Sequence, residues 1–511
     1  MRHTLRGFLC LAGTVHLVLG AAVFNWPDPL LDSLDHLLYL TATPVSTLAL
    51  NCGMRDNSTV AAQWLRLAYH DMATHDSTTG TGGLDASIAF ELDRPQNVGV
   101  GMTISLLDFA SVPNQYVGKA DVIAIGAINA VVGCGGPAIP FRGGRIDATE
   151  AGPATVPEPQ QDLASHVASF KAQGFSETEM ISLVACGHSL GGVQQVDFPL
   201  IVTEDVPTGI QTFVSTVGFD NTVVKEYLKG TTENVLVVGS NITTRSDLRI
   251  FSSDGNVTMQ SLASPETFNA VCVDLIGRML DTVPSTVTLT DPIEPFDFKV
   301  WNTFLFPQGG SLAFLATLRI IDTGLNRTVT MFWKERTGTF CPAAGCSIPP
   351  FKVSTDDATF LATVKGVMAF KSHLFNATID LATSISHFWF EVNDNDGSAP
   401  FIVDNHGANY TIDHDVVLYD PRRSSVTEFD GWMMVVGVKD PSTSINMTAL
   451  TTFAGKTVTV PFELDSSNPS TDGYTFYTSQ LRGPTPTTTV LAAVNGTAYS
   501  LWVPFMTTPG V

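Results

Sequence analysis

The sequence predicts a multidomain protein, with a mainly α-helical domain over residues 23–295 followed by a β-rich, sandwich-like region over residues 296–511. The 511 residues are too many for one hydrophobic core, so we expect at least two domains. Near residue 296 the pattern changes from apolar residues at helical spacing to short alternating runs of β-branched and aromatic residues. These runs predict one or two β-sandwich units.

Residues 1–22 are typical of a secretory signal peptide. Arg2 and Arg6 give a basic start, residues 8–19 form a mainly apolar run, and residues 20–22 are small. A membrane anchor is the weaker alternative because the run is short, and no later stretch reaches about 18 uninterrupted apolar residues. We therefore expect a secreted, extracellular protein without a membrane span.

Charge and glycosylation patterns agree with this location. The net charge of −22 argues against binding to the phosphate backbone of nucleic acids. Eight Asn-x-Ser/Thr sequons predict N-glycans, although such triplets also arise by chance in a Thr-rich chain. They begin at Asn57, Asn241, Asn256, Asn326, Asn376, Asn409, Asn446 and Asn495.

Apolar residues at helical spacing predict helices throughout the first domain. The predicted segments are residues 30–40, 120–132, 162–173 and 265–280. Connections rich in Gly and Pro, notably at 133–140 and 152–159, separate them. We expect helices joined by long loops, without an internal repeat.

A helix that contains Arg66 and His70 is the first candidate for a functional site. Asn57, Ser58 and Thr59 are N-cap candidates, and an apolar stripe follows them. Arg66 and His70 lie four residues apart, so a helix places them on one face. Burying both in an apolar stripe is costly unless they have a purpose. The alternative is a solvated helix edge with two ordinary polar residues.

A second candidate helix begins at Ser176, which is predicted to form a capping box with Glu179. Apolar residues continue to Val184, and His188 lies near the end of the helix. Gly191 is expected to stop the helix soon after His188.

Together, segments 66–71 and 185–191 resemble the distal and proximal helices of the plant, fungal and bacterial haem peroxidase superfamily. Their order, spacing and flanking residues are most similar to the secreted fungal branch, and the resemblance covers about residues 27–290. It implies a peroxidase domain that binds haem b, reduces hydrogen peroxide and oxidises small aromatic reductants.

The resemblance assigns three roles that side-chain chemistry supports. His188 is the axial ligand of the haem iron, for which a neutral imidazole is suited. His70 is the distal base, which takes a proton from one peroxide oxygen and returns it to the other. Arg66 is the distal Arg, whose guanidinium stabilises charge on the departing oxygen.

The resemblance also implies a set of supporting residues around the haem. Asp247 would accept a hydrogen bond from the proximal imidazole and make it more electron-donating. Asn97, six residues after Glu91, would orient the distal histidine. Tyr69, where the family usually has Phe or Trp, and Phe213 would lie beside the cofactor. From the residues alone, Asp247 also suits a helix N-cap, and Asn97 suits a turn.

A distal calcium site is implied directly after the distal histidine. Its ligands are Asp71, Gly83, Asp85 and Ser87. Two carboxylates, a hydroxyl and backbone carbonyls make an oxygen cage suited to calcium, whereas the alternative is an ordinary polar turn.

A proximal cation site is implied by Ser189, Ser215 and Asp220. Val214 stands near the position of a second family carboxylate. With one carboxylate fewer, we expect weak calcium binding, a monovalent ion or no ion.

Departures from the family narrow the expected activity. Manganese-oxidising members carry acidic residues seven and eleven positions before the distal histidine, where this chain has Gln63 and Thr59. Lignin-attacking members carry a surface Trp five positions before the proximal histidine, where this chain has Leu183. We therefore expect oxidation of phenols or dyes at the haem edge. The competing hypothesis is a catalytically silent glycoprotein with a binding or structural role.

Two structural pairs also follow from the resemblance. Arg145 and Asp121 resemble a buried ion pair of the family. Cys52 and Cys134 lie where the fungal branch has a disulfide, although the chain, with seven cysteines, lacks several others of that branch.

The region from residue 296 onward resembles no family. Alternating runs at 328–333, 387–392, 433–438 and 457–460 predict strands. Cys341 and Cys346 are candidates for a short local disulfide. Contact with carbohydrate, contact with protein and shielding of the first domain are all compatible with this region.

Overall fold

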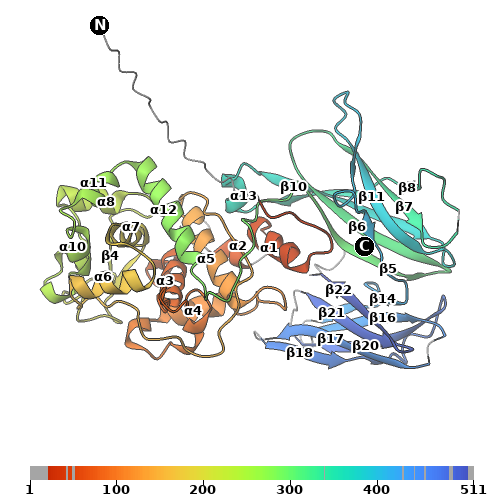
Figure 1. Cartoon of the computed structure of the whole chain (residues 1–511), viewed down its shortest axis with the longest axis horizontal. Helices are drawn as coiled ribbons and strands as arrows, with labels where there is room; N and C mark the ends of the chain where they lie inside the picture. The colour runs from red at the N-terminus through yellow and green to blue at the C-terminus, as the bar shows by residue number, and fades with distance from the viewer. Residues whose placement is uncertain are drawn as a thin grey trace, which may run out of the picture.

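The structure is a computed structural model that describes residues 21–41, 44–48, 52–338, 340–427, 431–441, 443–453, 456–482 and 487–504. Residues 1–20 of the expected signal peptide lie outside the described residues. A helical domain precedes a region of antiparallel sheets, and the two form separate lobes (Figure 1). The predicted fold class is confirmed.

The helical lobe is built around α5, in which every residue from Ala120 to Gly133 is buried. α2, α3 and α4 pack against α5, and α7 packs against α3, α6 and α12. The helices are α1 (Pro29–Tyr39), α2 (Pro44–Leu48), α3 (Val60–Met72), α4 (Val100–Phe109), α5 (Lys119–Gly133), α6 (Leu163–Ala172), α7 (Glu177–Gly187), α8 (Thr222–Lys229), α9 (Val235–Val238), α10 (Ser246–Phe251), α11 (Val257–Ser261) and α12 (Pro265–Leu280).

Local sequence signals explain where the two site helices begin. The Thr59 hydroxyl accepts a hydrogen bond from the amide of Ala62 at 3.1 Å, which caps α3. Ser176 and Glu179 form the predicted capping box at the start of α7. These caps satisfy backbone amides that have no partner within the helix, so the start of each site helix is well determined.

The β region consists of two sandwiches whose cores are in contact, because Val435 and Phe476 of the second lie in the hydrophobic cluster of the first, and Phe304 and Phe306 of the first lie in that of the second. The first contains sheets β5-β6-β10-β9 and β12-β11-β7-β8, with β13 beside β11; the second contains sheets β14-β16-β20-β19 and β18-β17-β21-β22, with β15 beside β16. The strands of the first are β5 (Phe298–Gln308), β6 (Ser311–Ile321), β7 (Thr328–Glu335), β8 (Cys346–Ile348), β9 (Lys352–Asp357), β10 (Ala369–Ile379), β11 (Ile385–Asn393), β12 (Phe401–Val403) and β13 (Tyr410–Thr411). Those of the second are β14 (Val417–Tyr419), β15 (Ser425–Thr427), β16 (Gly431–Lys439), β17 (Ile445–Phe453), β18 (Lys456–Pro461), β19 (Glu463–Leu464), β20 (Tyr474–Leu481), β21 (Thr488–Val494) and β22 (Thr497–Val503). The pairings of the described strands are antiparallel; the alternating runs at 328–333, 387–392 and 433–438 supply buried faces, whereas the run at 457–460 lies in β18, which is largely exposed.

A short helix links the two lobes. α13 (Phe360–Val364) lies between β9 and β10 in sequence but packs against α1 and α5 (Figure 1). Leu361 and Phe370 are buried in the same hydrophobic cluster as the helical domain. The boundary near residue 296 therefore divides the chain by secondary structure but does not separate the two cores.

A buried charge cluster, formed by Asp32, Asp35, Lys299 and Arg319, also joins the lobes. Asp35 of α1 lies 2.7 Å from the Arg319 guanidinium and 2.9 Å from the Lys299 ammonium group. Burial alone would raise the pKa of Asp35, but Arg319 and Lys299 together lower it to about 2. Arg319 also stacks over the ring of Phe370, 4.3 Å from its centroid.

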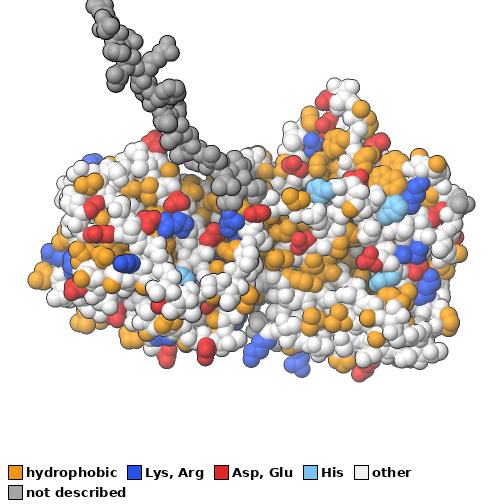
Figure 2. All heavy atoms as spheres, in the orientation of Figure 1, with side chains coloured by type: hydrophobic (Ala, Val, Ile, Leu, Met, Phe, Trp, Pro, Cys, Tyr) orange, Lys and Arg blue, Asp and Glu red, His pale blue; other side chains and the backbone are white. Residues whose placement is uncertain are grey.

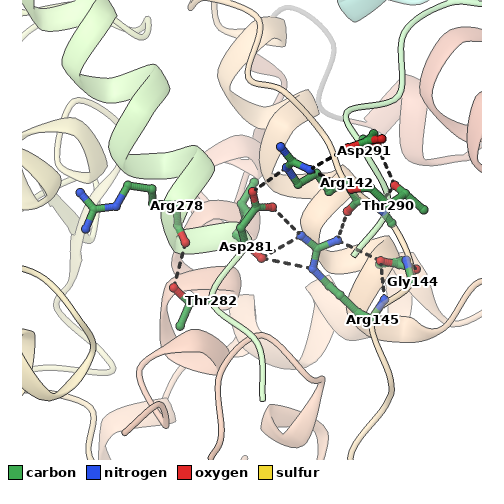
Figure 3. A network of polar contacts seen from close by, with 11 residues as sticks. Arg142, Gly144, Arg145, Arg278, Asp281, Thr282, Thr290 and Asp291 are labelled. Atoms are coloured by element: carbon green, nitrogen blue, oxygen red, sulfur yellow. Dashed lines mark hydrogen bonds and ion pairs between the residues drawn. The ribbon is translucent and has the colours of Figure 1, made fainter. Parts of the chain in front are cut away.

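The family-like pair of Arg145 and Asp121 is present, with 2.9 Å between nitrogen and oxygen and both side chains buried. Figure 3 shows how this Arg continues into a wider network. Arg145 also approaches Asp281 at 3.5 Å, and Arg142 approaches the same carboxylate at 3.4 Å. Arg142 donates to the carbonyl of Thr290 at 3.0 Å. This network holds the segment that leaves α12 toward the β region.

We predict that Asp35→Ala lowers the free energy of unfolding by about 3–5 kcal/mol, because it leaves Lys299 and Arg319 buried without their carboxylate. Urea unfolding monitored by circular dichroism measures the change. As a control, Lys365→Ala removes the more exposed pair with Glu294 and should cost about 1 kcal/mol or less. Equal losses in both variants would contradict this account of the junction.

Candidate functional site

A cavity of about 660 Å³ lies in the helical domain between α3 and α7. α3 contributes Arg66, Tyr69 and His70, and the end of α7 leads to His188. The apolar part of the lining includes Leu183, Val184, Leu236, Ile250, Ile276 and Met279. The structure therefore brings the two candidate histidines, more than a hundred residues apart in sequence, to one cavity.

The tautomer of His70 is determined by Asn97. The Nδ1 atom of His70 lies 2.8 Å from the amide oxygen of Asn97, whose nitrogen donates to the carbonyl of Glu91 at 3.0 Å. Since that amide oxygen can only accept, Nδ1 carries the proton and Nε2 is the basic nitrogen. Burial, reinforced by Arg66, lowers the pKa of His70 to about 3, so the ring is neutral at ordinary pH.

Arg66 is held by the same loop that supplies Asn97. Its guanidinium donates to the carbonyl of Gln96 at 3.0 Å and to that of Val98 at 3.2 Å. These two residues flank Asn97, the last residue of the short helix η3 (Pro95–Asn97). It also stacks over the ring of Phe198, 5.5 Å from the centroid. Burial lowers the pKa of Arg66 to about 10, so the side chain remains charged at neutral pH.

His188 is held by a carboxylate instead of an amide. Its Nδ1 atom lies 2.7 Å from Oδ2 of Asp247, near the start of α10. The ring of Phe213 stacks on the imidazole, with 4.1 Å between centroids and 20° between planes. With Nδ1 committed to Asp247, Nε2 is the nitrogen left to ligate a metal from the cavity wall.

Asn234 is a polar partner that sequence analysis missed. Its side chain is fully buried and donates from Nδ2 to Oδ2 of Asp247 at 2.7 Å. Nothing in the sequence around Asn234 distinguishes it from an ordinary helix N-cap, which it also is for α9.

Tyr69 lies between the cavity and α6. Its ring stacks on Phe170, with 5.9 Å between centroids, and its hydroxyl donates to the amide oxygen of Gln173 at 3.4 Å. Burial raises the pKa of the phenol, so Tyr69 remains protonated. Its contacts are those of a packed wall residue.

The distal calcium candidates lie together and are buried, with Asp71 in the last turn of α3 and the other three in the segment 83–87. The carboxylate of Asp71 accepts from the amides of Ala86 at 2.7 Å and Ile88 at 2.9 Å, and Asp85 accepts from the amide of Ser87 at 3.1 Å. Burial raises the pKa of Asp71, and the nearby charge of Asp85 adds to the rise. The buried hydroxyl of Ser87 has no hydrogen-bond partner of ordinary geometry. Gly83, at a φ of 121°, approaches the backbone of Thr282 so closely that a side chain would not fit.

The proximal cation candidates use their side chains elsewhere. Ser189 donates to the carbonyl of Cys186 at 2.8 Å, Ser215 donates to Glu226, and Asp220 accepts from the amide of Thr222 at 2.7 Å. Within the described residues, no group of three or more His, Cys, Asp or Glu side chains is arranged to hold a metal ion. The proximal site remains a prediction.

The region of the family's manganese site is occupied by a basic network. Arg55 donates to the amide oxygen of Gln63 at 2.8 Å and forms an ion pair with Asp108 at 2.9 Å. The indole of Trp64 donates to the same Asp at 2.8 Å. Leu183, at the position of the lignin-type Trp, is buried and lines the cavity. Neither specialised oxidation site has its family residues.

The cavity suits a haem in two respects. Its volume lies within the usual range of about 300–1,000 Å³ for cofactor pockets, and its lining is largely apolar. His188 offers a free Nε2 on one wall, and His70 and Arg66 lie on the wall formed by α3.

Three disulfides stabilise the described chain. Cys52 pairs with Cys134 and Cys341 with Cys346, as expected. The third joins Cys186 of α7 to Cys272 of α12 and was not predicted, although these were the two other cysteines within the helical domain.

The surface and the helices add two observations. On the face shown in Figure 2, Lys and Arg side chains are scattered among acidic ones over both lobes. Among the described helices, none combines the length and apolarity that crossing a bilayer requires.

Comparison with known proteins gives one family model and several relatives. A family model described as Peroxidase matches residues 48–263, which contain Arg66, His70, Asn97, His188 and Asp247. A WSC domain-containing protein of Arthroderma benhamiae is 35% identical over 385 residues, which are 71% of this chain and 52% of that protein. L-ascorbate peroxidase 5, peroxisomal, of Arabidopsis thaliana is 35% identical over 177 residues, 34% of this chain and 59% of that protein. The chain thus spans about half the length of these relatives.

We predict that nitrogen NMR of the protein labelled at histidine shows His70 neutral and protonated on Nδ1 from pH 7 down to about 3, since its pKa is lowered to about 3. Asn97→Leu removes the acceptor at Nδ1 and should yield a mixture of tautomers. A wild-type signal with the proton on Nε2 would contradict the assignment of the basic nitrogen.

Proposed function

Because residues 48–263 are a domain of the peroxidase family, we propose that this protein is a secreted haem peroxidase that reduces hydrogen peroxide and oxidises small phenolic or dye-like molecules at the haem edge. The observation that carries the proposal is the cavity shared by His70 and His188, each with Nδ1 engaged and Nε2 free.

On the proximal wall, His188 would hold the iron through Nε2. Asp247 accepts a hydrogen bond from Nδ1 of His188, which orients the imidazole and increases its electron donation. The stacked ring of Phe213 limits rotation of the imidazole. When bound, haem supplies the redox chemistry that cleaves the oxygen–oxygen bond.

On the distal wall, His70 moves the proton. Its Nε2 would accept the proton of one peroxide oxygen and pass it to the other oxygen. That second oxygen would then leave as water. Arg66 remains charged and stabilises negative charge as it develops on that oxygen. The loop that contains Asn97 also accepts the hydrogen bonds of Arg66. The Arg66 guanidinium and Nε2 of His70 therefore keep a fixed relative position.

Several features support secretion as part of the proposal. Disulfides are typical of oxidising compartments, and the described part of the chain has three. The asparagines of all eight sequons are exposed or partly exposed, so none is closed to a glycan by burial. We propose that the β region mediates contacts with carbohydrate or protein outside the cell.

The alternative function is that of a silent peroxidase-fold glycoprotein. Colour distinguishes the two. The purified protein should show a haem Soret band that shifts on addition of peroxide, and His188→Ala should lose the band. A colourless wild-type protein that does not take up added haem would support the silent alternative.

We predict that His70→Ala slows the reaction with peroxide by about 10²- to 10⁴-fold while haem remains bound, because the variant lacks the proton carrier. Stopped-flow absorbance of the Soret band measures the rate. His387→Ala, a change in β11 of the other lobe, serves as the control and should react at the wild-type rate. Equal rates in His70→Ala and wild type would remove His70 from the mechanism.

We also propose that Asp71, Gly83, Asp85 and Ser87 bind calcium, since a cation would offset the buried charge of two carboxylates. Calcium at a hundredfold excess over its Kd should stabilise the fold by about 2.7 kcal/mol, so a chelator should lower the melting temperature. Asp85→Asn should largely abolish the chelator's effect, whereas Asp76→Asn, a partly exposed neighbour, should retain it. A wild-type melting temperature that is insensitive to chelator would refute this site.

A further inference from the structure

Asp247 accepts two hydrogen bonds on the same carboxylate oxygen. Oδ2 lies 2.7 Å from Nδ1 of His188 and 2.7 Å from Nδ2 of Asn234. The other oxygen, Oδ1, lies 3.4 Å from the hydroxyl of Ser246. Within the described part of the chain, no Lys or Arg forms an ion pair with Asp247. The charge that this carboxylate presents to His188 is therefore set by neutral donors.

The orientation of the Asn234 amide is determined by its partners. Its oxygen accepts from the amide of Leu236 at 2.9 Å, where Asn234 caps α9. A backbone amide can only donate and a carboxylate can only accept, so the NH₂ group must point toward Asp247. The backbone amide of Asn234 is held in turn by the Thr232 hydroxyl at 3.2 Å.

The residue stacked on His188 cannot provide this hydrogen bond. Phe213 lies against the imidazole but has no polar hydrogen. Asn234 is fully buried, so water does not compete with its amide for Oδ2. A buried, preorganised donor of this kind interacts more strongly with a carboxylate than an exposed one.

We propose that Asn234 is a positioning residue that limits how strongly Asp247 polarises His188, and so raises the reduction potential of the bound haem iron. This inference rests on the proposed haem binding. By withdrawing negative charge from Oδ2, the amide weakens the pull of Asp247 on the Nδ1 proton. His188 then has less imidazolate character and donates less electron density to the iron, so it stabilises the ferric state less.

The test compares wild type, Asn234→Ser and Asn234→Ala after reconstitution with haem. Ser retains an oxygen that can cap α9, so this variant separates loss of the donor from loss of the helix cap. We expect both variants to have a lower midpoint potential for the ferric–ferrous couple, by spectroelectrochemistry, and a higher iron–histidine stretching frequency, by resonance Raman spectroscopy of the ferrous protein.

Asn114→Ser is the matched control, because Asn114 is also a buried Asn that caps backbone amides, those of Tyr116 at 2.8 Å and Val117 at 3.1 Å, away from any carboxylate. It should leave both readouts unchanged. If the Asn234 variants melt at lower temperature but retain the wild-type potential and frequency, the role of Asn234 is structural and the inference fails. If wild type takes up no haem, the proposed function fails instead.

Discussion

The proposed chemistry depends on one constraint: two imidazoles must present Nε2 to the same cavity. Both use the same device, a hydrogen bond from Nδ1 to a buried side chain, but with acceptors of different charge. The amide of Asn97 is neutral and keeps the proton on Nδ1 of His70, while burial and Arg66 lower the pKa of that ring to about 3 and make it a weak base. The carboxylate of Asp247 is ionic and makes His188 a stronger ligand. The two walls of the cavity therefore differ chemically because the two histidines have different hydrogen-bond partners.

One disulfide and a few hydrogen bonds keep the histidines and their partners in place. The disulfide from Cys186 to Cys272 fixes the end of α7, two residues before His188, against α12. The loop of Asn97 is held from one side by Arg66 and from the other by the carbonyl of Glu91. These contacts span segments far apart in sequence, so the geometry of the site depends on the packing of the whole helical lobe.

Much of this arrangement was predictable because it is local or periodic. Helical spacing predicted α1, α5, α6 and α12, and the capping box of Ser176 and Glu179 located α7. The spacing of Arg66 and His70 predicted their shared face. Features that depend on contacts between distant segments could not be predicted. In sequence, Asn234 resembles an ordinary helix N-cap, and α13 is a five-residue helix among strands. The pairing of strands into two sandwiches is likewise non-local, so alternation predicted strands without their partners.

The buried charge cluster between α1 and the first sandwich makes the stability of one lobe depend on the other. Asp32 and Asp35 have buried carboxylates whose cationic partners, Lys299 and Arg319, belong to the sheet. If the chain were cut before β5, both carboxylates would remain in the helical lobe without these cations. The helical lobe is therefore expected to be less stable on its own than in the intact chain, because its stability depends on cations that the sheet supplies.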